Sequence, residues 1–267
     1  MTEVFRLKQG RAPLLISFPH AGEVLPETLK PRLTGEALAL DDTDFVLPEL
    51  YGFVEGLGAS TIEPYYSRYV IDLNRPPDDV SLYPGQNTTG IMPVLDFSGR
   101  AIYRAGSEPD ADERVARIAF YWTPYHAALN AELERLRAVH GAVLLWDAHS
   151  IRNSLPYLFS GTLPDLNIGT AAGASAGAHI EAAIEQAARH SGAYSVITNG
   201  RFKGGYITRR YGQPSLGIHA VQLEMSKTIY LGHSQRPPID ANRASALRAT
   251  LRAMLAAALG ALAAGPE

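Results

Sequence analysis

Short apolar runs alternate along this chain with segments of helical periodicity, and this alternation is the strongest constraint on its fold. Strands are predicted over residues 14–18, 59–64, 67–73, 142–149, 194–199 and 219–226. Helices are predicted over residues 41–58, 111–139 and 173–192, with Pro124 kinking the second of them. Such alternation favours α/β layers around one mostly parallel or mixed sheet. We expect a single domain over residues 1–267.

The composition excludes several kinds of site and partner. The formal net charge of −3 gives no reason to expect binding to nucleic acid or to an anionic membrane surface. There is no cysteine, so any metal must be held by His, Asp or Glu. The N-terminal residues lack the apolar segment of a signal peptide, and the apolar C-terminal stretch is interrupted by Arg248 and Arg252. We therefore expect a cytoplasmic protein with a terminal packing helix.

Polar side chains stand at the ends of four predicted strands. His20 follows residues 14–18, Asn74 and Arg75 follow residues 67–73, His149 ends the strand 142–149, and Glu224 lies in the last strand. In open α/β sheets, ligand sites lie beyond the carboxyl ends of the strands. These side chains are therefore expected to converge on one site.

Two of these residues, His20 and His149, suit a catalytic zinc, which takes about three protein ligands and leaves a position for water. The third ligand is open at this point. Glu23 gives an H-x-x-E spacing with His20, whereas Asp42 and Asp44 in "DDTDF" are alternatives. Asp147 is a candidate for orienting one of the metal-ligating side chains without touching the metal itself.

Glu224 is the strongest candidate for a catalytic carboxylate. It interrupts the apolar strand "AVQLEMS", where an unpartnered charge is costly to bury. Beside an activated water it would act as general base, and then as the acid that protonates the leaving nitrogen.

Arginine-rich segments indicate an anionic substrate. "SRYVIDLNR" supplies Arg68 and Arg75, and "NGRFKGGYITRRYG" supplies Arg201, Lys203, Arg209 and Arg210. Arginine forms planar bidentate pairs with carboxylates. The segment 76–109, rich in Pro, Gly, Asn and Thr, is predicted to be a long loop that covers the bound substrate.

Five stretches resemble one protein family. "SRYVIDLNRPPDD", "LYPGQNTTG", "WDAHSIRNSLP", "GTLPDLNIGT" and "NGRFKGGYITRRYG" are similar to motifs of N-formylglutamate amidohydrolases, over about residues 12–232. The resemblance implies a three-layer α/β/α hydrolase fold similar to that of zinc carboxypeptidases. It also implies metal-dependent hydrolysis of N-formyl-L-glutamate to glutamate and formate, the last step of one bacterial histidine-degradation route.

The resemblance also suggests roles for particular residues. "RYVIDLNR" is similar to a substrate-binding segment of aspartoacylases and succinylglutamate desuccinylases, which implies that Arg68 polarises the scissile carbonyl. By the same likeness Asn74 and Arg75 hold a substrate carboxylate, and Arg201 is our candidate for the second one. The "DTD" motif belongs to the family pattern and favours Asp44 over Glu23 and Asp42. The implied ligand set for zinc, cobalt or another divalent ion is therefore His20, Asp44 and His149.

Two other functions compete with this interpretation. The first is a related zinc amidase or carboxypeptidase that acts on another N-acyl amino acid or on a peptidoglycan peptide. The second is a protein that binds small acidic ligands without catalysis.

Overall fold

A seven-stranded mixed sheet forms the centre of the computed structural model, which describes residues 3–82 and 85–265. The strands are β1 (Phe5–Lys8), β2 (Leu14–Ser17), β3 (Ser60–Pro64), β4 (Val143–Ile151), β5 (Leu166–Gly169), β6 (Val196–Thr198) and β7 (Ile218–Ser226), in the order β1-β3-β2-β4-β7-β5-β6. Strands β3, β2, β4 and β7 are parallel neighbours, and β5 and β6 are parallel to each other. Strand β1 pairs antiparallel with β3, and β5 pairs antiparallel with β7. The expected mixed, mostly parallel sheet is confirmed.

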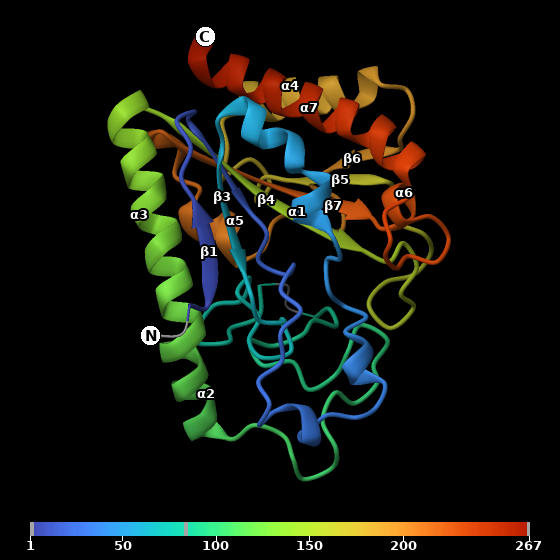
Figure 1. Ribbon diagram of the computed structural model, residues 1–267. Coiled ribbons are helices and arrows are strands. Elements are labelled where there is room, and N and C mark those ends of the chain that lie inside the picture. The colour runs from blue at the N-terminus through green and yellow to red at the C-terminus, as the bar shows by residue number, and fades with distance from the viewer. Residues whose placement is uncertain (1–2, 83–84, 266–267) are drawn as a thin grey trace.

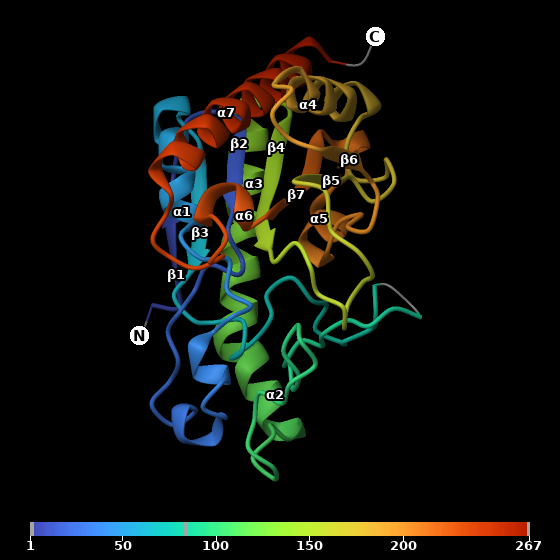
Figure 2. The ribbon, with the colours of Figure 1, turned by 90° about the vertical axis from the view of Figure 1, so that its right-hand side faces the viewer.

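Helices cover both faces of this sheet. They are α1 (Leu47–Leu50), α2 (Ala111–Arg117), α3 (Thr123–His140), α4 (Ala178–His190), α5 (Tyr206–Tyr211), α6 (Thr228–Leu231) and α7 (Ala241–Ala264). One apolar core packs α1, α4 and α7 on one face, and a second packs α3 and α5 on the other (Figures 1 and 2). The expected three-layer α/β/α architecture is confirmed. Within α7, Leu247, Leu251 and Met254 are buried against the first core, as a packing helix requires.

The two central strands, β4 and β7, carry the polar groups that the sequence singles out. All nine residues of each strand are buried, which explains why both read as nearly continuous apolar runs. Side chains alternate between the two faces, so Leu145 and Ala220 join the core under α3 and α5. Further along the same face stand Asp147 and His149 of β4 beside their β7 partners, Gln222 and Glu224.

A π-helical turn interrupts the long helix next to Pro124, where the sequence predicts a kink. Residues Ile118–Trp122 form this turn between α2 and α3, and Pro124 occupies the first turn of α3. Proline has no N–H to donate to the preceding turn, so the regular α-helical ladder is interrupted there.

Two predicted elements are wrong. Residues 67–73 form turns rather than a strand: Val70 N donates to Ser67 O, and Asp72 N donates to Ile91 O in a loop. Residues 41–58 do not form one helix, because Val46 adopts a left-handed conformation with φ of 55°. Only the short α1 and a 3₁₀ helix (Gly52–Leu57) form after it.

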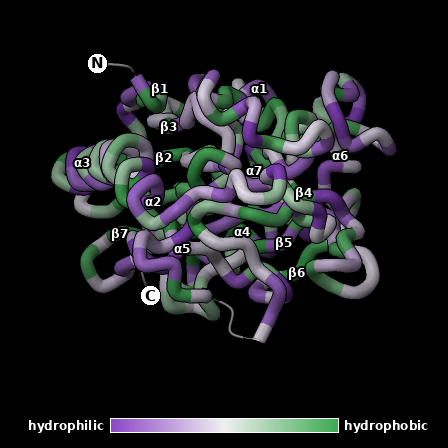
Figure 3. The backbone as a smooth tube through the Cα atoms, turned by 90° about the horizontal axis from the view of Figure 1, so that it is seen from below, coloured by the Kyte–Doolittle hydropathy of each residue, from purple (hydrophilic) through white to green (hydrophobic). Residues whose placement is uncertain are grey.

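Irregular segments gather beyond the carboxyl ends of the parallel strands. Residues 18–46, 65–82 and 85–110 form the lower part of Figure 1, in blue to green. Figure 3 views this end from below and shows hydrophilic and hydrophobic stretches alternating along the loops. This is where the sequence predicts a binding site.

Candidate functional site

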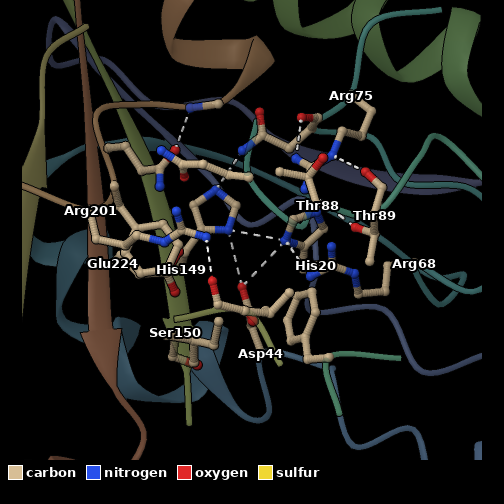
Figure 4. Close-up of a pocket in the computed structure, with 18 of the residues that line it drawn as sticks. His20, Asp44, Arg68, Arg75, Thr88, Thr89, His149, Ser150, Arg201 and Glu224 are labelled. Atoms are coloured by element: carbon tan, nitrogen blue, oxygen red, sulfur yellow. Dashed lines mark hydrogen bonds and ion pairs between the residues drawn. The ribbon is translucent and has the colours of Figure 1, made fainter. Parts of the chain in front are cut away.

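His20, Asp44 and His149 converge at the ends of the central strands (Figure 4). Their potential ligand atoms all lie within 4.8 Å of one another, and all three residues are buried. The Nδ1 atoms of the two histidines are 3.1 Å apart, and Asp44 Oδ2 lies 3.2 Å from His149 Nδ1 and 3.7 Å from His20 Nδ1. Two imidazole nitrogens and a carboxylate oxygen are ligands that suit zinc or a similar divalent ion. The residues present therefore fit a metal centre.

The local backbone explains why Asp44 reaches this centre. Asp44 N donates a hydrogen bond of 3.0 Å to His20 O, which joins the two segments directly. The buried Lys227 donates from Nζ to Thr43 O at 2.6 Å and to Asp41 O at 3.1 Å. These contacts fasten the loop 41–44 to the end of β7.

Buried carboxylates hold the far side of each imidazole ring. Asp72 Oδ1 is 2.6 Å from His20 Nε2, and Asp147 Oδ2 is 3.0 Å from His149 Nε2. A carboxylate on one ring nitrogen fixes the tautomer and leaves the other nitrogen for a metal. In both rings the nitrogen left is Nδ1, the atom that faces the centre.

Asp72 was missed by the sequence interpretation, which placed it inside a strand. It is fully buried, and its Oδ2 pairs with Arg68 Nη2 at 2.5 Å while its Oδ1 also accepts from Asn74 N. The available signal was an acidic residue in an otherwise apolar run that ends at a predicted site, the same signal that singled out Glu224.

The charges at the site depend strongly on burial. Burial, together with the nearby Arg68, lowers the pKa of His20 to about 4. Burial acts the same way on His149, but the neighbouring carboxylates Asp147 and Asp44 outweigh it and raise its pKa well above the usual value. Burial also raises the pKa of Glu224 to about 8. The carboxyl of Glu224 is thus a much stronger base than an exposed glutamate.

A pocket opens directly onto the three converging residues. Glu224 lines it from β7, where its Cα is paired with that of His149. The three predicted arginines, Arg68, Arg75 and Arg201, also line it. The pocket therefore combines a candidate metal centre, a carboxyl of raised pKa and several cations.

A different contact holds each of the three arginines and Asn74 at the pocket. Arg68 stacks on Phe97, with its guanidinium carbon 4.4 Å from the ring centroid. Arg75 Nε donates to Thr89 O at 2.8 Å, and Arg201 Nη2 donates to Leu158 O at 2.8 Å. Asn74 accepts from Ile207 N and donates to Asp147 Oδ2, so its amide ties α5 to the carboxylate behind His149.

The alternatives for the third ligand lie elsewhere. Glu23 is exposed, and it is not among the residues that converge on the centre. Asp42 is buried but accepts a hydrogen bond from Phe97 N through Oδ2. Asp44 is thus the carboxylate that the structure places between the two histidines.

The long loop 76–109 contributes one wall of the pocket. Gln86, Asn87, Thr88 and Thr89 line it, and Asn87 Nδ2 donates to Tyr157 O across the rim at 2.8 Å. The placement is consistent with a loop that contacts bound substrate.

Taken together, the fold and the site define a three-layer α/β protein with a candidate metal centre at the carboxyl ends of its strands. Residues 12–231 match the family model of N-formylglutamate amidohydrolase, and the chain belongs to this family. An N-formylglutamate deformylase of Pseudomonas aeruginosa is 50% identical over 255 residues, which cover 96% of each protein. One of Pseudomonas putida is 45% identical over 259 residues, or 97% of each.

A solved structure supports the fold assignment. The crystal structure of N-formylglutamate amidohydrolase from Ralstonia eutropha JMP134 superposes with a TM-score of 0.79 and 24% sequence identity. The match covers 95% of this chain and 97% of the other. The expected likeness to zinc carboxypeptidases stays a prediction.

Proposed function

We propose that this protein hydrolyses N-formyl-L-glutamate to L-glutamate and formate, as the last step of a histidine-degradation route in the cytoplasm. The observation that carries the proposal is the convergence of His20, Asp44 and His149 beside Glu224, in a pocket lined by arginines. Two relatives that carry the name N-formylglutamate deformylase match nearly the whole chain. The partner is a small anionic substrate, with no nucleic acid or membrane involved.

His20, Asp44 and His149 would hold one divalent ion, zinc first, with cobalt or another divalent ion as alternatives. When bound, such an ion supplies Lewis acidity toward water and toward the formyl oxygen. Asp72 and Asp147 keep the two imidazoles in the tautomer that presents Nδ1.

Glu224 accepts the proton of the attacking water and then delivers it to the leaving nitrogen. Burial raises its pKa to about 8, which brings its basicity close to that needed for proton transfer at neutral pH. Arg68 stabilises the negative charge that develops on the former carbonyl oxygen. Its ion pair with Asp72 and its stacking on Phe97 hold the guanidinium in place beforehand.

Arg75 and Arg201 each bind one of the two carboxylates of the substrate. Asn74 helps to hold the same carboxylate as Arg75. Their fixed positions on the pocket wall orient the formyl group toward Glu224. Arginine suits this task because its planar fork donates two parallel hydrogen bonds to a carboxylate.

Formate release from a panel of N-formyl, N-acetyl and N-succinyl amino acids, with and without added metal, tests the proposal. We expect the highest kcat/KM for N-formyl-L-glutamate and loss of activity after chelation, restored by a divalent ion. A preference for a longer acyl group or a peptide would favour the related-amidase function instead. If the purified protein binds N-formyl-L-glutamate yet holds no metal and releases no formate, it is a binding protein.

A further inference from the structure

Gln222 lines the pocket from β7, two residues before Glu224 and on the same face of the strand. It is 4% exposed, and its Oε1 accepts a hydrogen bond of 2.7 Å from Gly205 N. A backbone N–H can only donate, so the oxygen and nitrogen of this amide are assigned without ambiguity. The Nε2 group is therefore the end of the side chain that remains for a ligand in the pocket.

The backbone that holds this amide is closely packed. Gly205 precedes α5, and a Cβ there would lie 2.5 Å from Asn74 Nδ2, so its backbone sits directly on the Asn74 amide. Asn74 Oδ1 in turn accepts from Ile207 N at 2.8 Å. Because Gly205 N donates to Gln222 Oε1, a rotation of the Gln222 amide would leave this N–H unpaired. Its orientation is thus set before substrate binds.

An amide fixed in this way presents N–H donors to an anion. The same pocket holds Arg75 and Arg201, so a substrate carboxylate is the acceptor that its charge favours. Two residues of strand separate the Cα atoms of Gln222 and Glu224 by about 7 Å. A formylglutamate whose amide lies at Glu224 carries one carboxylate on the Cα next to the amide nitrogen and a second two methylenes further away. The distance from the amide to the side-chain carboxylate matches the separation of Gln222 and Glu224 better than the distance to the α-carboxylate does.

We propose that Gln222 is a specificity-determining residue whose Nε2 donates to the side-chain carboxylate of the substrate. The inference rests on the proposed function, because it assumes an N-acyl acidic amino acid in the pocket. A neutral donor at this position favours a carboxylate over a carboxamide, since hydrogen bonds to a charged acceptor are the stronger ones.

The test is Gln222→Glu, compared with wild type on three substrates. The new side chain keeps the shape and an oxygen for Gly205 N–H but replaces the donor by a second anion. For N-formyl-L-glutamate, we expect KM to rise at least about tenfold, the effect of one charge-assisted hydrogen bond, with a smaller change in kcat. KM should rise as much for the α-carboxamide analogue, which keeps the distal carboxylate. KM should change little for N-formyl-L-glutamine, which lacks the distal carboxylate.

Two further variants separate recognition from folding and from net charge. Gln222→Met removes both donor and acceptor without adding charge. The proposal is supported if KM rises less than in Gln222→Glu, and again rises more for the two substrates with a distal carboxylate than for N-formyl-L-glutamine. Gln186→Glu adds the same charge on α4, in the layer on the other side of the sheet, and should leave all three KM values unchanged. Metal content and Tm, measured for every variant, show whether the site is intact.

The outcomes are distinguishable. If wild type hydrolyses N-formyl-L-glutamate and a folded, metal-loaded Gln222→Glu keeps its KM within about twofold, the role of Gln222 is overturned while the proposed function stands. A penalty that falls on N-formyl-L-glutamine and spares the α-carboxamide analogue overturns the assignment to the distal carboxylate. Absence of formate release by wild type defeats the proposed function itself.

Discussion

The Nδ1 atoms of His20 and His149 lie 3.1 Å apart, although 129 positions separate the two residues in the sequence. The cause is topological: β2 and β4 are parallel neighbours, so His20, three residues past the end of β2, comes to lie beside His149 near the end of β4. Each ring is held from behind by a carboxylate, Asp72 or Asp147. Two imidazole nitrogens aimed at one point, with Asp44 beside them, form a ligand set that suits a divalent cation.

Loss of either imidazole should therefore abolish metal binding. We expect His20→Ala and His149→Ala to lose bound metal and activity, while circular dichroism shows a preserved fold. Asp44→Ala should lose most of the metal as well, whereas Glu23→Ala, at an exposed position outside the cluster, should retain it. Metal analysis after dialysis measures this. Full occupancy in either histidine variant would refute the ligand set.

Asp72 offers a test of the support behind the ligands. Asp72→Asn keeps the size of the side chain but loses the charge that orients His20 and pairs with Arg68. Removal of such a partner typically costs about 10- to 100-fold in metal affinity or activity. Metal titration followed by formate release should show both losses. Asp112→Asn, at an exposed position on α2, is the matched control and should behave as wild type.

The central strands could be read from sequence because burial of both faces demands continuous apolar residues. β4 and β7 were found in this way, and Asp147, His149 and Glu224 stood out within them as exceptions. The same rule failed for residues 67–73. Their apolar side chains are also buried, with Tyr69 and Val70 in a small core around Leu33 and with Ile71 and Leu73 under α3. An apolar run indicates that its residues are buried, but it does not indicate that they pair with a neighbouring strand.

Pairings between distant segments were not predictable from local patterns. Local patterns left three carboxylates open as metal ligands: Glu23 by its H-x-x-E spacing with His20, and Asp42 and Asp44 by their place in "DDTDF". The hydrogen bond from Asp44 N to His20 O and the contacts of Lys227 with the loop decide which carboxylate reaches the centre. Such contacts depend on the three-dimensional packing of β7 against the loop 41–44.

The loop 76–109 is predicted to respond to substrate. Thr88 and Thr89 line the pocket, and Thr89 O accepts from Arg75 Nε, so the loop is joined directly to a proposed substrate-binding residue. We expect N-formyl-L-glutamate, added to an inactive Glu224→Gln variant, to slow limited proteolysis within this loop. Cleavage elsewhere on the surface serves as the internal control. An unchanged cleavage pattern in the loop at saturating ligand would remove it from substrate recognition.

Arg75 should act in binding rather than in chemistry. Arg75→Lys keeps the charge but loses the planar fork and the hydrogen bond from Nε to Thr89 O, so KM should rise roughly tenfold or more. Some loss of kcat is expected too, because a remote carboxylate helps to position the scissile amide. Steady-state kinetics measures both. Arg137→Lys on the exposed face of α3 is the control, and loss of metal from Arg75→Lys would contradict the assignment.

Glu224 should show the opposite pattern. Glu224→Gln preserves the shape of a side chain that lines the pocket beside His149 but cannot accept a proton from water. Removal of a general base typically lowers the rate by about 10²- to 10⁴-fold, and since this loss arises in the transition state it should appear in kcat with little change in KM. Metal should remain bound, because Glu224 is not one of the three converging ligands. Near-normal turnover of a metal-loaded Glu224→Gln would assign the proton transfer to another group in the pocket.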